Sequence, residues 1–284
     1  MRSRVLIGCV VAAVLCSAGA ALAQKSGGVL RMYHRSNPPS ASIHEEATIS
    51  TVVPFMPVFN NLVLFDPAVA QNSEASIVPD LAESWSWNDD GTELTFKLRQ
   101  GVKWHDGLPF TATDVECTFN LLTGRARDNL RRNPRATWYR NINYVHSDNA
   151  YEVTIYLNRP QPSILSLLAS GYSPIYPCHI PPAQMRLKPI GTGPFKFHSF
   201  KEFERIKLVR NPDYWKPGRP YLDGIEYTIV TSPTTALLSF SAGRFDMTFP
   251  WEVTVPQLKE TQRPKSKTVC ETSAMNNNTN LLVN

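Results

Sequence analysis

Residues 79–115 read PDLAESWSWNDDGTELTFKLRQGVKWHDGLPFTATDV and carry the strongest local signals of the chain. The tetrapeptide Asn-Asp-Asp-Gly at 88–91 predicts a tight turn, because glycine accepts the backbone angles that such turns need. After this turn Leu94, Phe96 and Leu98 alternate with polar residues, which is the period of a strand with one buried face. Apolar alternation on both sides of an Asp-Gly turn predicts a β-hairpin.

A helix is predicted shortly after this hairpin. Thr113 has the character of an N-cap, and Glu116 stands three residues later, in the position of a capping box. The apolar residues Val115, Phe119 and Leu122 recur at helical spacing, so the helix is expected to end near Leu122 with these side chains buried.

The rest of the chain is predicted to contain many short strands and few helices. Residues 125–140 are expected to form a basic, polar connection. Proline is frequent, at 23 residues against 14 glycines, which favours extended segments and ordered loops. Many strands, few helices and no repeat predict a mixed α/β (α+β) fold. Further strands are expected at 28–33, 60–66, 153–157, 206–210, 225–230 and 245–248, and further helices within 42–59, 162–169 and 234–242.

Composition places the chain among globular proteins. It has 284 residues, of which 42% are hydrophobic and 19% charged, a balance that argues against disorder and against a coiled coil. The net charge is +5, but the basic residues are scattered, with one dense run at 125–135. A nucleic-acid-binding protein would show a basic stripe or a known motif. Neither is found, so no nucleic-acid partner is expected.

The first 23 residues have the layout of a secretory signal peptide. Arg2 and Arg4 precede an apolar run at 5–15, and small residues ending in Ala-Leu-Ala follow. The apolar run is too short to span a bilayer as a mature helix. Export with cleavage after Ala23 is therefore expected, and loss of the two arginines lowers the net charge from +5 to +3.

Five cysteines are present, and Cys9 and Cys16 would leave with the signal peptide. The three that remain are Cys117, Cys178 and Cys270. In an oxidising compartment an odd number allows one disulfide and one free thiol, but three separate thiols are an equally good interpretation. The spacings of 61 and 92 residues match no zinc-binding pattern.

No residue pattern typical of an enzyme is found. His105 and Asp106 suggest a base oriented by a carboxylate, but a turn histidine beside a capping aspartate is the simpler interpretation. Gly191-x-Gly193 lacks the third glycine of a dinucleotide loop, and no serine stands in a Gly-x-Ser-x-Gly motif. The six histidines show no metal-binding helix spacing. The sequence therefore predicts a protein that is not an enzyme and has no metal or cofactor.

The tryptophans are candidates for a ligand surface, although most are expected to pack in the core. Trp251 is the exception, because Phe249-Pro250-Trp251 follows an expected strand and precedes a proline-bounded loop, which favours an exposed ring. The six tryptophans are Trp85, Trp87, Trp104, Trp138, Trp215 and Trp251.

Several blocks of the sequence resemble one protein family. The first lies in the stretch quoted above, with PDLAESW, DGTELTFKLRQGVKWHDG and FTATDV. Later blocks are PIGTGPF at 189–195, RNPDYW at 210–215, PYLDGI at 220–225 and AGRFD at 242–246. In this order and spacing they resemble the signature of the family 5 extracellular solute-binding proteins, which are receptors of ABC importers for peptides, dipeptides and nickel. The resemblance covers essentially all of 24–284.

The resemblance implies a periplasmic binding protein-like fold of type II, in which two lobes close on a solute. Family members are considerably longer than this chain, so the resemblance implies that only lobe I is present and that lobe II is missing. Lobe I would consist of a discontinuous subdomain Ia, at 24–60 and 186–270, and an inserted subdomain Ib at 61–185. Residues 271–284 would be a strand that crosses toward lobe II.

The resemblance also implies where lobe I meets the solute, after the first strand and after Asp246. Arginine can hold a carboxylate with two hydrogen bonds, aromatic rings offer flat apolar contact, and glutamate can pair with a cationic group. Arg35 and Glu252 are equally compatible with solvated loop charges. The implied ligand-binding residues are Tyr33, His34, Arg35, Ser36, Phe249, Trp251 and Glu252.

The implied function is that of a monomeric, non-catalytic receptor in the periplasm. It would capture an oligopeptide, a dipeptide or another small solute and deliver it to an inner-membrane ABC permease with its ATPase subunits. Two alternatives stay open: a truncated gene product without binding activity of its own, and a secreted hydrolase, for which no nucleophile–base pair is visible. One lobe buries little of a solute, so poor binding, or none, is expected of the chain as it stands.

Overall fold

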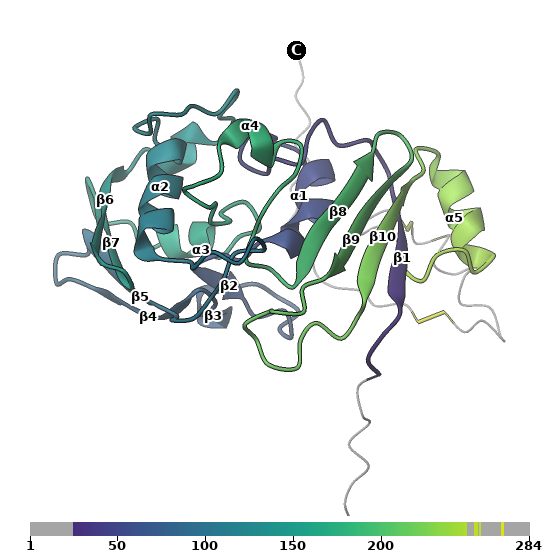
Figure 1. Ribbon diagram of the computed structural model, residues 1–284, viewed down its shortest axis with the longest axis horizontal. Coiled ribbons are helices and arrows are strands. Elements are labelled where there is room, and N and C mark those ends of the chain that lie inside the picture. Colours follow the sequence, from purple (N-terminus) through teal and green to yellow (C-terminus); the bar gives the residue numbers. More distant parts are fainter. Residues whose placement is uncertain (1–24, 249–252, 255, 257–267, 270–284) are drawn as a thin grey trace, which may run out of the picture.

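The computed structural model describes residues 25–248, 253–254, 256 and 268–269. Over these residues two four-stranded sheets lie side by side, with a two-stranded sheet and several helices around them (Figure 1). This is the mixed α/β architecture expected from the sequence. The strands are β1 (Val29–His34), β2 (Val63–Phe65), β3 (Ile77–Pro79), β4 (Ala82–Trp87), β5 (Glu93–Leu98), β6 (Ile142–Asn149), β7 (Glu152–Leu157), β8 (Phe195–Lys201), β9 (Arg205–Arg210) and β10 (Gly224–Ile229). The helices are α1 (Ile49–Phe55), α2 (Ala112–Leu122), α3 (Ile164–Leu168), α4 (Pro182–Met185) and α5 (Pro233–Ser241), with 3-10 turns at Met56–Val58, Glu74–Ser76 and Ala136–Tyr139.

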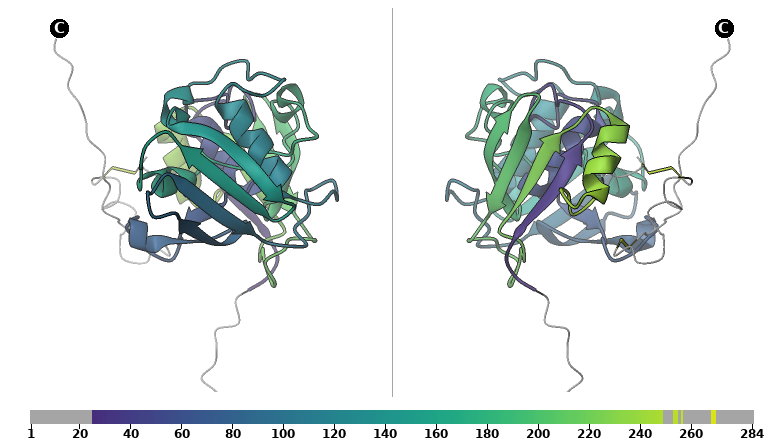
Figure 2. Two further views of the ribbon diagram at one scale, coloured as in Figure 1. Left: turned by 90° about the vertical axis from the view of Figure 1, so that its left-hand side faces the viewer. Right: turned by 90° about the vertical axis from the view of Figure 1, so that its right-hand side faces the viewer.

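The first sheet has the strand order β1-β10-β9-β8. β1 and β10 run parallel, whereas β9 is antiparallel to both of its neighbours, β10 and β8. α1 packs against one face, where Phe55 and Ile206 are fully buried. On the other face α5 lies beside β1, with Ala236 packed in one cluster with Tyr33 (Figure 2). The end of β1 is therefore held by helices from both sides.

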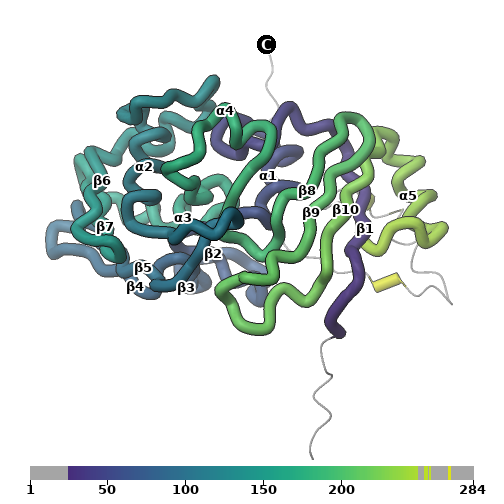
Figure 3. Tube along the Cα trace, viewed as in Figure 1, coloured from purple at the N-terminus to yellow at the C-terminus, as the bar shows by residue number. Residues whose placement is uncertain are grey.

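The second sheet has the order β4-β5-β7-β6 and is antiparallel throughout. Leu94, Phe96 and Leu98 of β5 are buried, as their alternation predicts, in a core that they share with Phe119 of α2. The chain enters this part of the molecule after α1 and returns to the first sheet before β8 (Figure 3).

The start of α2 corrects the capping prediction by two residues. Thr111 is the N-cap, in extended backbone, and Asp114 completes the capping box by accepting the Thr111 N–H at 2.9 Å. Glu116 instead accepts hydrogen bonds from the N–H and the hydroxyl of Ser147 in β6. Thr113 is therefore not the cap. Thr111 with Asp114 and Thr113 with Glu116 both fit the capping-box pattern, but the Glu116 carboxylate is hydrogen-bonded to the neighbouring sheet.

A buried polar cluster around Asp80 joins the two sheets. This carboxylate is 2% exposed and accepts hydrogen bonds from Asn60 Nδ2 at 2.9 Å and from Lys216 Nζ at 2.6 Å. Asn60 Oδ1 in turn accepts from Trp215 Nε1 at 3.3 Å and from the Thr192 hydroxyl at 3.2 Å. Most of these residues lie in, or directly beside, the PDLAESW, PIGTGPF and RNPDYW blocks. The blocks therefore specify how the sheets join.

Gly191 and Gly193 permit the closest backbone approach at this junction. A Cβ on Gly191 would overlap the carbonyl oxygen of Val58, and a Cβ on Gly193 would lie 2.5 Å from its carbonyl carbon. The Gly193 N–H donates to the same Val58 oxygen at 3.0 Å. No larger residue fits at either position, because the obstacle is backbone that cannot rotate away.

His105 completes the junction and is not poised as a base. Its Nε2–H donates to the Gly193 carbonyl at 3.0 Å, and its Nδ1 accepts the Gly191 N–H at 3.3 Å. Burial lowers the pKa of His105 to about 4. Asp106 accepts the Leu108 N–H at 3.2 Å, as a turn-capping aspartate does. His105 and Asp106 are therefore a turn histidine and a capping aspartate, the simpler of the two interpretations of their sequence.

Cys117 and Cys178 form a disulfide, which joins α2 to the proline-rich loop at 171–182. Beside it, the Thr118 hydroxyl donates to the Tyr176 carbonyl at 3.1 Å and accepts the Tyr176 N–H at 2.9 Å. Of the two interpretations of the cysteines, the structure has the one with a bridge. Cys270 lies outside the described residues.

Three strands, the helix α4 and one expected strand differ from the sequence predictions. β3 has three residues and α4 has four, which is too short for a period to show in the sequence. β6 and β8 are not predicted, because β-bulges shift their register and interrupt the alternation of apolar residues. Residues 245–248, expected as a strand, make a single parallel bridge between Met247 and Met32.

Phe203 has an unusual backbone in the turn between β8 and β9. Its φ is 59°, in the left-handed region that glycine and asparagine tolerate best, while its side chain is 73% exposed. We expect Phe203→Asn to raise the free energy of unfolding by about 1 kcal/mol and the Tm by about 3 °C, because backbone strain is relieved and little packing is lost. Thermal unfolding followed by circular dichroism measures this. Phe203→Ala keeps a constrained backbone, and an equal gain in that control would contradict the explanation.

Candidate functional site

The candidate site lies at the edge of the first sheet where β1 and β10 end. These strands are parallel, and Met247 forms a parallel bridge to Met32 of β1. Loops that follow parallel strands meet at the carboxyl edge, which is where open α/β sheets bind ligands. Here the loops are residues 35–48 after β1 and 230–232 after β10.

Tyr33 and His34, two of the expected site residues, are buried behind this edge. Tyr33 is 2% exposed, and its ring packs edge-on against Phe245 with 5.6 Å between centroids. His34 is fully buried, and its Nε2–H donates to the Ser50 carbonyl at 2.8 Å. Burial, with a smaller effect from Arg35, lowers the pKa of His34 to about 4, so its ring is neutral at pH 7. Both side chains support the edge from the inside.

Arg35 and Ser36 are the expected site residues that reach the surface. The Arg35 side chain is exposed, and Ser36 is half-buried. The Ser36 hydroxyl lies 2.5 Å from the Ser50 hydroxyl, which connects the end of β1 to the start of α1. A guanidinium next in sequence to the Ser36 hydroxyl suits an anionic ligand group, since arginine binds a carboxylate through two parallel hydrogen bonds.

An apolar stripe of α1 and the turn after it continues this surface. Ile49, Val53 and Met56 recur at the spacing of one helix face, and each is partly exposed, Met56 to 46%. The opposite face is buried, with Thr51 and Phe55 fully inaccessible. We call this combined surface the candidate wall; its residues are Arg35, Ser36, Ile49, Ser50, Val53 and Met56.

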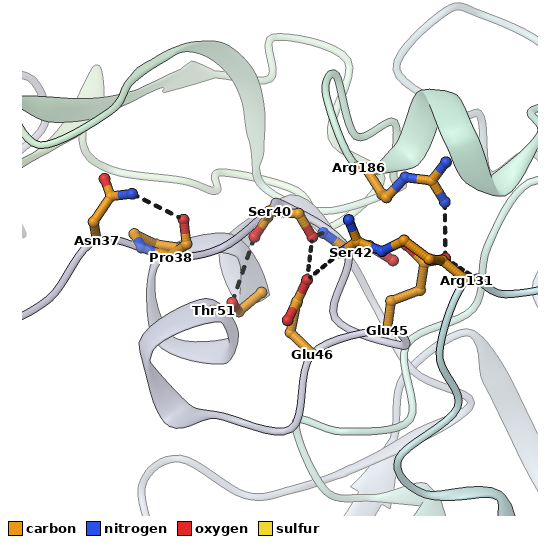
Figure 4. A network of polar contacts seen from close by, with 9 residues as sticks. All are labelled: Asn37, Pro38, Ser40, Ser42, Glu45, Glu46, Thr51, Arg131 and Arg186. Atoms are coloured by element: carbon orange, nitrogen blue, oxygen red, sulfur yellow. Dashed lines mark hydrogen bonds and ion pairs between the residues drawn. The ribbon is translucent and has the colours of Figure 1, made fainter.

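Buried charges hold the loop that precedes α1. Glu45 is 1% exposed and accepts hydrogen bonds from the Arg131 N–H at 2.5 Å and from Arg186 Nη1 at 2.8 Å (Figure 4). Glu46 accepts from Arg131 Nη2 at 3.0 Å and from the Ser40 hydroxyl at 2.8 Å (Figure 4). These contacts fix the backbone that leads into the candidate wall.

Arg135 corrects the expectation that residues 125–140 form a plain polar connection. It is 3% exposed, and its guanidinium donates to the Glu46 carbonyl at 2.8 Å and to the Ile43 carbonyl. Burial lowers the pKa of this guanidinium. The sequence contains the arginine, but its carbonyl partners lie more than 80 residues away in the chain, so local reasoning could not find them.

Arg31 and Asp246 anchor the segment that leads to the second half of the expected site. Arg31 Nη2 donates to Asp246 Oδ1 at 2.7 Å, and Arg31 Nε donates to Oδ2 at 3.1 Å. The hydrogen bond from Arg31 lowers the pKa of Asp246. The aspartate of the AGRFD block therefore has a structural role, which is to pair with Arg31 of β1. The remaining expected site residues, Phe249, Trp251 and Glu252, lie outside the described residues.

Trp138 is a surface residue that sequence reasoning missed. It is 45% exposed and is the most exposed of the tryptophans that the structure describes, whereas Trp104 is 2% exposed. The sequence favours an exposed ring for Trp251 and predicts that most other tryptophans pack in the core. The available signal was the position of Trp138 inside an arginine-rich connection without apolar periodicity.

Neither a membrane span nor a metal cluster occurs in the part of the chain described here. None of its helices has the length and apolar character needed to cross a bilayer. Nor does it bring together three or more His, Cys, Asp or Glu side chains that could hold a metal ion.

Comparison with known proteins identifies relatives of this chain. A Brucella ovis protein, provisionally named an ABC transporter peptide-binding protein, is 34% identical over 201 residues, which are 67% of this chain and 36% of that protein. The di/tripeptide-binding protein 4 of Pseudomonas aeruginosa is 28% identical over 88% of this chain and 49% of that protein. The structure of the periplasmic binding protein DppA from Helicobacter pylori, in complex with the peptide STSA, has a TM-score of 0.74 at 23% identity and covers 85% of this chain and 50% of that one.

The fold is that of periplasmic binding proteins over about half of their length. Residues 76–284 match the family described as bacterial extracellular solute-binding proteins, family 5 middle. The chain therefore belongs to the family 5 extracellular solute-binding proteins, as its sequence blocks indicate. It spans half or less of the length of the relatives named above.

Proposed function

We propose that this chain forms one lobe of a receptor that captures a small solute outside the inner membrane and delivers it to an ABC permease with its ATPase subunits. The observation that carries the proposal is the candidate wall, where an exposed arginine and two hydroxyl groups at the carboxyl edge of parallel strands continue into an apolar stripe. Relatives are named for binding di- and tripeptides and glutathione. A peptide-like solute with a free carboxylate is therefore the proposed class, bound without catalysis by a monomer.

The lobe division is part of the proposal. Subdomain Ia, at 24–60 and 186–270, would contain the first sheet and the candidate wall. Subdomain Ib, at 61–185, would contain the second sheet, and the Asp80 cluster would join the two. Residues 271–284 would lead toward a second lobe. Two separate apolar cores, one per sheet, support a division into two subdomains, but Tyr176 and Met185, within 61–185, are buried in the core of the first sheet.

Export to the periplasm, with cleavage after Ala23, completes the proposal. The Cys117–Cys178 disulfide supports it, because disulfides form and persist in oxidising compartments and are rare in the bacterial cytosol.

Replacement of Arg35 tests the proposed site. Arg35→Ala should weaken the binding of a carboxylate-bearing peptide by about ten- to a hundredfold, since a hydrogen bond to a charged group contributes about 1.5–3 kcal/mol. Tri-alanine and glutathione are suitable probes, and calorimetry at millimolar concentration also detects weak binding.

Arg159→Ala is the matched control, because Arg159 is an exposed arginine in the loop that follows β7 and is not part of the candidate wall. Its affinity for the probes should equal that of the unchanged chain. If Arg35→Ala binds as tightly as the control, Arg35 does not hold the carboxylate. If the unchanged chain binds neither probe at millimolar concentration, this lobe does not bind a peptide-like solute by itself.

A further inference from the structure

An exposed aromatic pair, Trp138 and Tyr172, lies in the segment of the chain between α2 and α4. The rings of Trp138 and Tyr172 pack edge to face, with 5.6 Å between centroids and an interplanar angle of 85°. Trp138 remains 45% exposed in this arrangement, although a tryptophan ring is a costly surface to leave in water. A fixed, exposed ring of this kind offers flat apolar contact to a ligand.

The aromatic pair is continuous with the candidate wall. Gly171, which precedes Tyr172, approaches α1 so closely that a Cβ there would lie 2.8 Å from Met56 Sδ and 3.4 Å from Val52 Cγ1. Met56 is the last residue of the apolar stripe, and its thioether side chain adapts to partners of different shape. Arg35, the stripe and the aromatic pair therefore belong to one surface, which runs from the end of β1 along α1 to the loop at 171–182 and the turn Ala136–Tyr139.

Arg135 holds the aromatic pair in place and sets the local charge. Its guanidinium carbon lies 4.9 Å from the Tyr172 ring centroid and 5.8 Å from that of Trp138, while its donors bind backbone carbonyls of the loop before α1. The rings thus already have a cation behind them. This region contains more positive than negative charge. Its arginines are Arg131, Arg135 and Arg186, and its carboxylates are Glu45 and Glu46.

We propose that Trp138, Tyr172 and Met56 form the specificity-determining subsite of the proposed solute site, and that it accepts a bulky, neutral apolar or aromatic group of a carboxylate-bearing solute. A cationic group is disfavoured there, because a second positive charge on these rings would be repelled by Arg135 in a partly buried setting of reduced dielectric. Arg135 is a positioning residue in this proposal. The proposal rests on the solute-binding function proposed above.

Three tripeptides that differ only in the central side chain test the subsite. Calorimetry of the purified chain is performed with Ala-Phe-Ala, Ala-Ala-Ala and Ala-Lys-Ala. We expect Ala-Phe-Ala to bind about tenfold more tightly than Ala-Ala-Ala, and Ala-Lys-Ala to bind no more tightly than Ala-Ala-Ala. Trp138→Ala should abolish the preference for phenylalanine, whereas Trp138→Phe should retain most of it. Leu187→Ala is the control, since Leu187 is a 78% exposed apolar residue elsewhere.

The outcomes separate this inference from the function on which it rests. Equal affinities for the three peptides in the unchanged chain would overturn the subsite and leave solute binding intact. A phenylalanine preference that survives in Trp138→Ala would also overturn it. Failure of the unchanged chain to bind any of the peptides would overturn solute binding by this lobe, and the subsite with it.

Discussion

Acidification from pH 7 to pH 5 should lower the free energy of unfolding of this chain by about 6 kcal/mol. Burial lowers the pKa values of His34, His44 and His105 from 6.5 to about 4, about 3 and about 4. Each ring is buried or half-buried as a neutral donor whose Nε2–H reaches a backbone carbonyl. This loss is large in comparison with the total stability of a domain, which is commonly about 5–15 kcal/mol.

The sign follows from where protons bind. Below about pH 6.5 each of these rings is protonated in the unfolded chain. In the folded chain the ring stays neutral until the pH reaches its lowered pKa. Stability therefore falls as the pH falls from 6.5 toward 4, and these rings contribute no pH dependence above about pH 7. At pH 5 each ring accounts for a loss of about 2 kcal/mol.

Urea unfolding at pH 7, 6 and 5, followed by tryptophan fluorescence, measures this loss. His44→Gln retains an amide donor for the Pro174 carbonyl but cannot titrate, so it should remove about a third of the pH dependence. His198→Gln is the control, because His198 is exposed. A urea midpoint that does not change between pH 7 and pH 5 would show that the three rings are not buried as neutral groups.

Loss of the Cys117–Cys178 disulfide should lower the free energy of unfolding by about 4 kcal/mol. The bridge closes a loop with a sequence separation of 61 residues, and in the chain-entropy description a loop of this length restricts the unfolded chain by about that amount. The hydrogen bonds between Thr118 and Tyr176 remain when the bridge is removed, so the native contacts of the loop should persist. The variant is Cys117→Ser with Cys178→Ser.

Urea unfolding of this double variant at pH 7 gives the difference directly. Cys270→Ser is the control and should unfold like the unchanged chain. Thiol titration of the denatured exported protein should find one free thiol, which belongs to Cys270. Three free thiols, or a double variant as stable as the control, would mean that the bridge does not form.

The blocks that reveal the family and the residues proposed to choose the solute lie in different places. Asp80, His105 and the two glycines of PIGTGPF join the sheets, where buried hydrogen bonds and backbone contact tolerate few substitutions. Arg35 and Trp138 are exposed and outside these blocks. The family is therefore easy to read from the sequence, whereas the solute is not.

Local signals in the sequence were enough for the elements whose period is uninterrupted. The alternation of Leu94, Phe96 and Leu98 identified β5 and its buried face, and the spacing of Phe119 and Leu122 identified α2. These predictions succeed because side-chain direction follows the backbone period within one element. β6 and β8 were not predicted, since their bulges are set by the partner strand and interrupt the alternation of apolar residues.

Contacts between distant segments required the folded chain. The choice of Thr111 over Thr113 as the cap depends on β6, and the burial of Arg135 depends on carbonyls that the chain brings to it from before α1. The site divides in the same way: the sequence indicated Tyr33 to Ser36, but it could not tell that Tyr33 would be buried while Trp138 stays exposed. Whether a side chain faces water depends on what packs against it from elsewhere, and that is a property of the tertiary structure.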